Sequence, residues 1–169
     1  NGPIHLREGF TIPADMDAGG LHDAMASIGA RQVLTVLQQL VSSAPPAPRP
    51  QSSAGITYAE KITKADRAID WSRPAAAILN QVRGLSPSPA ASFVLEGEII
   101  KLIRAEAAKG DAYKPAGHVL DERLRINCGS GTALRPLELQ RPGRNRQDLS
   151  QFLQGFLVKT GIICQKSHG

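Results

Sequence analysis

The feature that most constrains the fold of this sequence is a proline-rich stretch, SSAPPAPRPQSSA, at residues 42–54. Its four prolines lack backbone N–H groups and have a fixed φ, so the stretch favours an extended, polyproline-like conformation. It therefore predicts a semi-rigid linker, which we assign to residues 42–55, between two parts at residues 1–41 and 56–169. A ligand for a proline-binding domain is the alternative interpretation of the same residues.

The first part predicts one strand and two helices. Residues 4–7 alternate apolar and polar side chains, as a short strand does. Asp15 or Asp17 offers a side-chain oxygen to cap the following helix, which Gly29 is expected to end before a second helix over residues 30–43. The apolar side chains fall at helical spacing: Leu21, Met25 and Ile28, then Val33, Leu37, Leu40 and Val41. His22 is interpreted as a surface or cap residue rather than a ligand.

The second part predicts a small antiparallel barrel. Ser72 and Pro74 favour the start of a helix over residues 74–85 that buries Ile78 and Val82. Residues 92–108 read as two strands joined by a turn at Glu96–Gly97, and further short strands follow up to residue 141. A short closing helix is expected over residues 146–156. Residues 159–169 show no convincing pattern.

Charge is unevenly distributed along the chain. Residues 1–56 hold three basic and four acidic side chains, whereas residues 57–169 hold 17 basic and 11 acidic ones. A basic part joined to a near-neutral one indicates a polyanionic partner, because each Lys or Arg placed at a phosphate releases a counterion. A generally basic surface without such a partner is the alternative.

Several kinds of site find no support in the sequence. Cys128 and Cys164 have neither a CxxC nor a Cys/His metal spacing, so we expect two free thiols and no metal site. No run of apolar residues is long enough to predict a membrane-spanning helix. We expect a monomeric, cytoplasmic protein without a membrane partner.

Five stretches, in order along the chain, resemble methionyl-tRNA formyltransferases. ITYAEKITKADRAIDW is similar to the start of that family's C-terminal domain, and QVRGLSPSPAASF to its Arg-x-x-x-Pro-x-Pro turn, with Ser88 where a Trp is frequent. LEGEIIKLIRAEA resembles its first barrel hairpin, and LRPLELQRPGRNRQDLSQFLQGF its last strand and closing helix. NGPIHLREGFTIPADMDAGGLHDAMASIGARQVL resembles the end of its catalytic domain.

The resemblance implies an α+β chain. A remnant of a Rossmann-like formyltransferase domain, one strand plus two helices, is expected to precede an antiparallel β-barrel like those that bind oligonucleotides. We expect residues 1–41 alone to be poorly stabilised, because their apolar faces lack the sheet they should cover.

The family transfers a formyl group from 10-formyltetrahydrofolate to the amino group of initiator methionyl-tRNA, using an Asn, a His and an Asp. The Asp belongs to a turn that matches Asn1–Gly2–Pro3, and it would directly precede Asn1. His5 follows that turn and does not replace the family's His. The chain is thus expected to contain no catalytic residue, to bind no cofactor itself, and to be inactive without an N-terminal catalytic half.

The resemblance also implies that the barrel helps to hold tRNA, and basic side chains are the candidates for phosphate contact. The predicted tRNA-binding residues are Lys61, Lys64, Arg83, Lys101, Arg104, Arg141, Arg144 and Arg146. In a regular strand Lys101 and Arg104 would face opposite sides, and either could pair with Glu98 or Glu106 instead. Lys61 and Lys64 are equally consistent with a solvated helical face.

Trp71 is interpreted as a core anchor, and Asp70 as a cap for the turn before the helix. With seven aromatic residues, the chain favours recognition of RNA shape and backbone over stacking on single strands. Two other functions remain open at this point. One is the C-terminal part of a related formyltransferase that acts on a folate or a sugar nucleotide, and the other is a standalone RNA-binding module.

Overall fold

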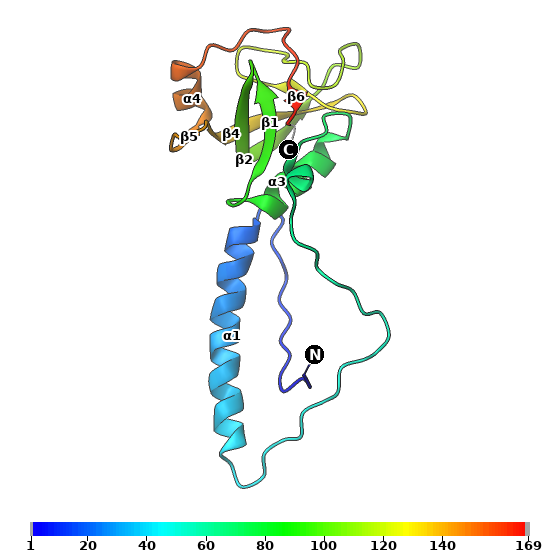
Figure 1. Ribbon diagram of the computed structural model, residues 1–169, viewed down its shortest axis with the longest axis vertical. Coiled ribbons are helices and arrows are strands. Elements are labelled where there is room, and N and C mark those ends of the chain that lie inside the picture. Colours follow the sequence, from blue (N-terminus) through cyan, green and yellow to red (C-terminus); the bar gives the residue numbers. More distant parts are fainter. Residues whose placement is uncertain (1, 168–169) are drawn as a thin grey trace. The chain divides into compact units, whose positions relative to one another are not determined.

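The computed structural model describes residues 2–167 and divides the chain into two compact units between Lys61 and Ile62 (Figure 1). The first contains one helix, α1, and extended segments. The second contains an antiparallel sheet with short helices.

In the first unit, α1 (Ala18–Leu40) runs without interruption through Gly29. The expectation of two helices separated at Gly29 is therefore wrong. A single Gly costs a helix only about 1 kcal/mol relative to Ala, and the good helix formers around Gly29 outweigh it. The side chain of Asp17 caps the helix by accepting a hydrogen bond from the N–H of Gly20 at 2.8 Å, so the expected N-terminal cap is confirmed.

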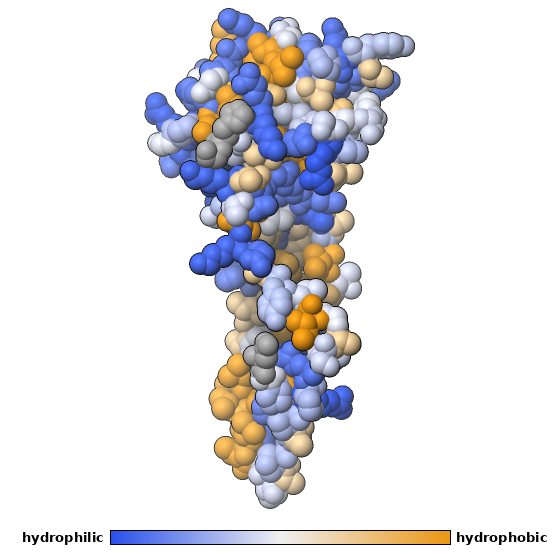
Figure 2. All heavy atoms as spheres, turned by 45° about the vertical axis from the view of Figure 1, so that its right-hand side comes forward, coloured by the Kyte–Doolittle hydropathy of each residue, from blue (hydrophilic) through white to orange (hydrophobic). Residues whose placement is uncertain are grey.

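The expected strand at residues 4–7 is reduced to one bridge. Ile4 and Arg49 exchange two backbone hydrogen bonds of 2.7 and 2.8 Å, and no ladder extends from them among the described residues. No residue of α1 is buried. Figure 2 shows hydrophobic side chains gathered on the surface of this unit. They include Met25, Val33, Leu34, Leu37, Leu40 and Val41.

The second unit opens with two helices. The turn α2 (Lys64–Arg67) has a capping box, in which Thr63 and Asp66 satisfy each other's backbone N–H groups. Helix α3 (Ala75–Leu85) buries Ile78 and Val82, as the sequence predicts. Its N-cap is Pro74, which lacks a capping side chain, so Ser72 is not the cap.

Two contacts replace the expected cap of α3. The N–H of Ala75 donates instead to Oγ1 of Thr132, at 2.8 Å, from a distant part of the sequence. Asp70 forms the turn ahead of the helix by accepting from the N–H and the hydroxyl of Ser72, at 3.0 and 2.6 Å.

The sheet is antiparallel, with strand order β3–β4–β2–β1–β6 and β5 paired to β4. The strands are β1 (Ala91–Leu95), β2 (Glu98–Lys109), β3 (Ile126–Asn127), β4 (Thr132–Gln140), β5 (Arg146–Asp148) and β6 (Gln165–Lys166). The β1–β2 turn is at Glu96 and Gly97, both with positive φ, as the sequence predicts. Helix α4 (Leu149–Gly155) is the expected closing helix, and it buries Phe152.

The C-terminal segment closes the sheet into a barrel. Val119 forms a bridge with Ile126, the first residue of β3. The N–H of Val119 also donates to the carbonyl of Ile162 at 2.9 Å. The chain then continues from Ile162 into β6, which pairs with β1. The sequence shows no pattern here because strand contacts of one or two residues are too short for an alternation of polar and apolar side chains to register. Residues 168 and 169 lie outside the described part.

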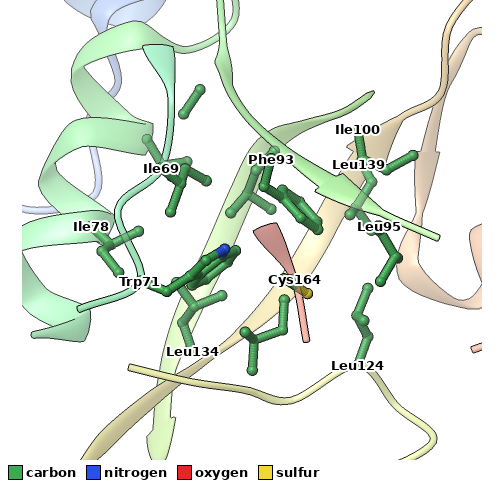
Figure 3. Packing of buried hydrophobic residues seen from close by; sticks show 14 of the residues in the cluster. Ile69, Trp71, Ile78, Phe93, Leu95, Ile100, Leu124, Leu134, Leu139 and Cys164 are labelled. Atoms are coloured by element: carbon green, nitrogen blue, oxygen red, sulfur yellow. The ribbon is translucent and has the colours of Figure 1, made fainter. Parts of the chain in front are cut away.

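The barrel interior is one apolar cluster (Figure 3). Trp71 is 5 % exposed and packs edge-on against Phe93, with ring centroids 5.3 Å apart, which confirms its structural role. Cys128 and Cys164 are both free and buried in this cluster, and burial raises the pKa of the Cys128 thiol to about 12.

An irregularity in β2 and β4 changes which residues face the core. Ile100 and Leu102 belong to the core on β2, yet Ala105 rather than Arg104 packs against it further along. The register shifts on both sides of Arg104, and each strand accommodates one extra residue. Lys101 and Arg104 therefore both face outward, whereas a regular strand would have put them on opposite faces.

Candidate nucleic-acid interface

The structure separates the predicted basic residues into two groups within the second unit. Lys101, Arg104, Arg141, Arg144 and Arg146 lie on β2, β5 and the turn between β4 and β5. Lys64 lies on α2 and Arg83 on α3. Lys61 is the last residue of the first unit. The first group is the one that the sheet assembles.

A row of three polar residues crosses the outer face of the sheet. Gln140 on β4 is the direct partner of Lys101 on β2 and of Arg146 on β5. Directly opposed residues share a face, and neighbouring strands lie about 4.8 Å apart, which places the Cα atoms of Lys101 and Arg146 about 10 Å apart. The two cations thus flank one amide.

The next row along the same face has the opposite charge balance. Arg104 is exposed and is paired with Glu138, which is paired in turn with Asp148 on β5. This row contains two carboxylates and one guanidinium, so its net charge is negative and the local positive potential is lowered. Positive charge is therefore concentrated at the Lys101–Arg146 row and not at Arg104.

Arg141 is held by several contacts within the protein. Its Nη2 and Nε donate to the two carboxylate oxygens of Glu98 at 2.7 and 3.0 Å, and its Nη1 donates to the carbonyl of Gly155 at 3.1 Å. The guanidinium also lies over the ring of Phe156, 5.1 Å from its centroid. The hydrogen bonds from Arg141 lower the pKa of Glu98. Arg141 thus ties the β4–β5 turn to the start of β2 and the end of α4.

The turn that follows presents Arg144 to solvent. The side-chain amide of Gln140 donates to the carbonyl of Arg144 at 2.8 Å, and the N–H of Arg144 donates to the carbonyl of Arg141 at 3.2 Å. None of the ion pairs found among residues 2–167 involves Lys101, Arg144 or Arg146. These three charges are available to a ligand: Arg144 lies on the turn between β4 and β5, and Lys101 and Arg146 lie on the neighbouring strands.

The residues near α2 and α3 are arranged differently. Lys61 and Lys64 are exposed, and Lys64 opens the single turn of α2. Arg83 is half-buried on α3, where its Nη2 donates to Oδ1 of Asn80 at 3.2 Å. The sequence reasoning missed Gln140 altogether, because an amide between two charged stretches carries no signal until the strand register is known.

Other chemistry finds little support. In the described part of the chain, no cluster of three or more His, Cys, Asp or Glu could hold a metal ion. A pocket of about 350 Å³ lies beside His118 and Arg125, and several of its polar groups bond within the surrounding loop, although Nδ1 of His118 has no hydrogen-bond partner among the described residues. Asp111, for example, accepts from the N–H of Tyr113 at 2.9 Å. None of the helices described is long and apolar enough to cross a membrane.

A barrel with a basic outer row is typical of domains that bind nucleic acid. Residues 61–157 match the model of the formyl transferase C-terminal domain, and the chain belongs to this family. Its relatives include three proteins named methionyl-tRNA formyltransferase. Those of Ruegeria pomeroyi and Caulobacter vibrioides are each 41 % identical, over 95 % and 96 % of this chain, and that of Ralstonia pickettii is 44 % identical over 85 %.

The chain spans about half the length of these relatives: 51 %, 53 % and 45 %, respectively. The resemblance inferred from the sequence is confirmed by these matches. Among solved structures, HypX from Aquifex aeolicus, in complex with tetrahydrofolic acid, superposes with a TM-score of 0.56. It is 18 % identical and covers 81 % of this chain but 26 % of its own, so the likeness concerns the fold alone.

Proposed function

We propose that this chain is the C-terminal part of a methionyl-tRNA formyltransferase and that its barrel positions the initiator methionyl-tRNA. The observation that carries the proposal is the row of Lys101, Gln140 and Arg146 beside Arg144, where positive charge lies on one outer face. Such contacts to phosphates would orient the RNA without reading its sequence. The row makes Lys101, Arg144 and Arg146 stronger candidates than Arg104 and Arg141.

Formyl transfer in this proposal needs residues beyond the chain. The relatives are about twice as long, and the apolar side chains exposed on α1 suit a packing surface for the remainder of such a protein. We assign no residue of this chain to 10-formyltetrahydrofolate and propose that this co-substrate binds the remainder of the protein. The 169-residue chain alone is proposed to be catalytically inactive, monomeric and, like translation enzymes, cytoplasmic.

A salt titration tests tRNA positioning. The full chain is titrated with initiator methionyl-tRNA at several salt concentrations, as the parent and as the double variant Lys101→Gln/Arg146→Gln. Removing two phosphate contacts should weaken binding about tenfold and reduce the slope of log K against log salt by roughly 1.5 to 2. The matched control is Lys114→Gln/Arg123→Gln, which removes the same charge at two exposed positions outside the row.

Equal losses of tRNA affinity in the two double variants would show that binding depends on net charge and not on the position of the charges in the row. Formyl transfer by the chain alone would contradict the proposal that catalysis needs further residues.

A further inference from the structure

A pocket of about 290 Å³ lies at one end of the basic row. Two outward residues of β2, the last residue of β4 and the turn after it form its walls. The lining residues are Ile99, Lys101, Gln140, Arg141, Pro142 and Gly143. Its volume is near the lower end for small-molecule sites, about 300 Å³, so it suits one small group rather than an extended segment.

The walls of this pocket are mainly apolar although it opens to solvent. Ile99 is 47 % exposed on the outer face, and Pro142 follows Arg141 in the turn. No carboxylate lines the pocket. An apolar surface of this kind can contact the face of a flat ring. Every nucleic-acid base has such a face, so contact of this type does not depend on which base is present.

The pocket is also preorganised. Arg141 is fixed by Glu98, Gly155 and Phe156, which holds the turn that carries Pro142. The amide of Gln140 makes one hydrogen bond, to the carbonyl of Arg144, among the residues described, and its oxygen is left as an acceptor. A ligand that enters would therefore meet rigid apolar walls and one amide already held in place.

Charge surrounds this apolar centre on two sides. Lys101 lines the pocket itself, and Arg146 lies across Gln140 from it in the same row. Both side chains are long enough to reach phosphates on either side of a group in the pocket. These features correspond to the parts of one nucleotide. The apolar walls suit the face of the base, the single amide suits its polar edge, and the two flanking cations suit its phosphates.

We propose that this pocket binds a single unpaired nucleotide of RNA, with the base between Ile99 and Pro142 and its polar edge at Gln140. The adjacent phosphates lie at Lys101 and Arg146. The inference rests on the proposed function and deepens it, because it adds recognition of an unstacked base to contacts with the backbone. A folded RNA with one extruded nucleotide fits this arrangement better than a continuous helix does.

Fluorescence anisotropy with the full chain tests the proposal. The probes are three labelled RNA hairpins: one with a single unpaired adenosine, one with an abasic nucleotide at the same place, and one fully paired. The abasic hairpin keeps every phosphate, so it isolates the base. The variant is Ile99→Ser, and its control is Ile163→Ser, at an isoleucine of similar exposure, 53 %, outside the pocket. Pro142→Ser is a second variant that perturbs the opposite wall.

The parent chain should bind the adenosine hairpin about 3- to 10-fold more tightly than the abasic and paired ones. Ile99→Ser and Pro142→Ser should each remove this preference and leave binding of the abasic hairpin unchanged. Ile163→Ser should retain the preference. If removing the base and substituting Ile99 or Pro142 have effects on affinity that do not add, the base and that side chain are in contact.

Three results would overturn the inference. Equal affinity of the parent chain for all three hairpins would show that it contacts phosphates and not the base, and the proposed function would stand. An acidic peptide that displaces RNA with the same dependence on Ile99 would assign the pocket to a protein segment. Failure to bind any RNA, methionyl-tRNA included, would overturn the proposed function as well.

Discussion

Replacing Gly129 by Ala should destabilise the barrel strongly, because no space exists for a Cβ atom. A Cβ built on Gly129 would lie 1.8 Å from the carbonyl oxygen of Ser72, which is a backbone atom and cannot move by rotation of a side chain. The N–H of Gly129 also donates to the carbonyls of Trp71 and Arg73, at 3.0 Å each. The substitution must therefore push the β3–β4 turn away from the segment ahead of α3.

The size of the effect follows from the contacts that are lost. Each backbone hydrogen bond contributes about 1 kcal/mol, and more when its donor stays buried without a partner. Separation of the turn would also weaken the hydrogen bond from Ala75 to Thr132, which replaces a cap for α3. We expect a loss of roughly 3 kcal/mol, which lowers the Tm of a unit of about 100 residues by roughly 10 to 15 °C.

Thermal unfolding followed by tryptophan fluorescence measures this directly, since Trp71 is the single Trp and adjoins the perturbed contact. The matched control is Gly84→Ala on α3, where a Cβ would meet nothing within 4 Å. There Ala should stabilise the helix by about 0.5 to 1 kcal/mol, so the two substitutions have opposite signs. A Tm for Gly129→Ala within about 2 °C of the parent would refute the reasoning.

Three further predictions concern pH, thiols and local stability. Hydrogen bonds in the folded chain lower the pKa of Asp66 and Asp148 below 3.8. The two carboxylates therefore stabilise the fold at pH values above their unfolded pKa, and this stabilisation is lost as the pH falls through their folded pKa. The free energy of unfolding, from urea titrations, should decrease below about pH 4, and a constant value down to about pH 2 would contradict this. Burial should protect Cys128 and Cys164 from a thiol reagent at about pH 8 until the chain unfolds, and rapid labelling of the native chain would contradict their placement. Backbone amides of α1 should exchange with solvent much faster than those of β2 in the isolated chain, because α1 buries no residue, and equal protection would show that it is stabilised.

Local patterns in the sequence predict much of the second unit correctly. The β1–β2 hairpin, the apolar face of α3 and the core role of Trp71 each follow from spacing within a short window. The C-terminal segment escapes prediction because it pairs through short contacts with β1 and with the strand segment around Val119. Gly29 misleads because a helix tolerates one Gly when its neighbours favour the helical state.

The candidate interface is predictable in composition but not in arrangement. The sequence indicates the basic residues, since their number is visible in the charge balance. It does not show that Gln140 aligns Lys101 with Arg146, because strand register is a property of pairing. Nor does it show that Arg141 is engaged by Glu98, a residue 43 positions away.

The paired irregularity of β2 and β4 has a consequence for how this domain tolerates insertions and deletions. Loss of Ile103 would remove the extra residue of β2, and Leu102, Arg104 and Ala105 would then alternate in, out and in as in a regular strand. Arg104 would stay on the outer face, and Ala105 would stay against the core. The extra residue on β4 would remain opposite β2 as a single bulge. A deletion can therefore be absorbed at this point of the sheet, whereas a deletion in a regular part of β2 would turn the later side chains to the other face.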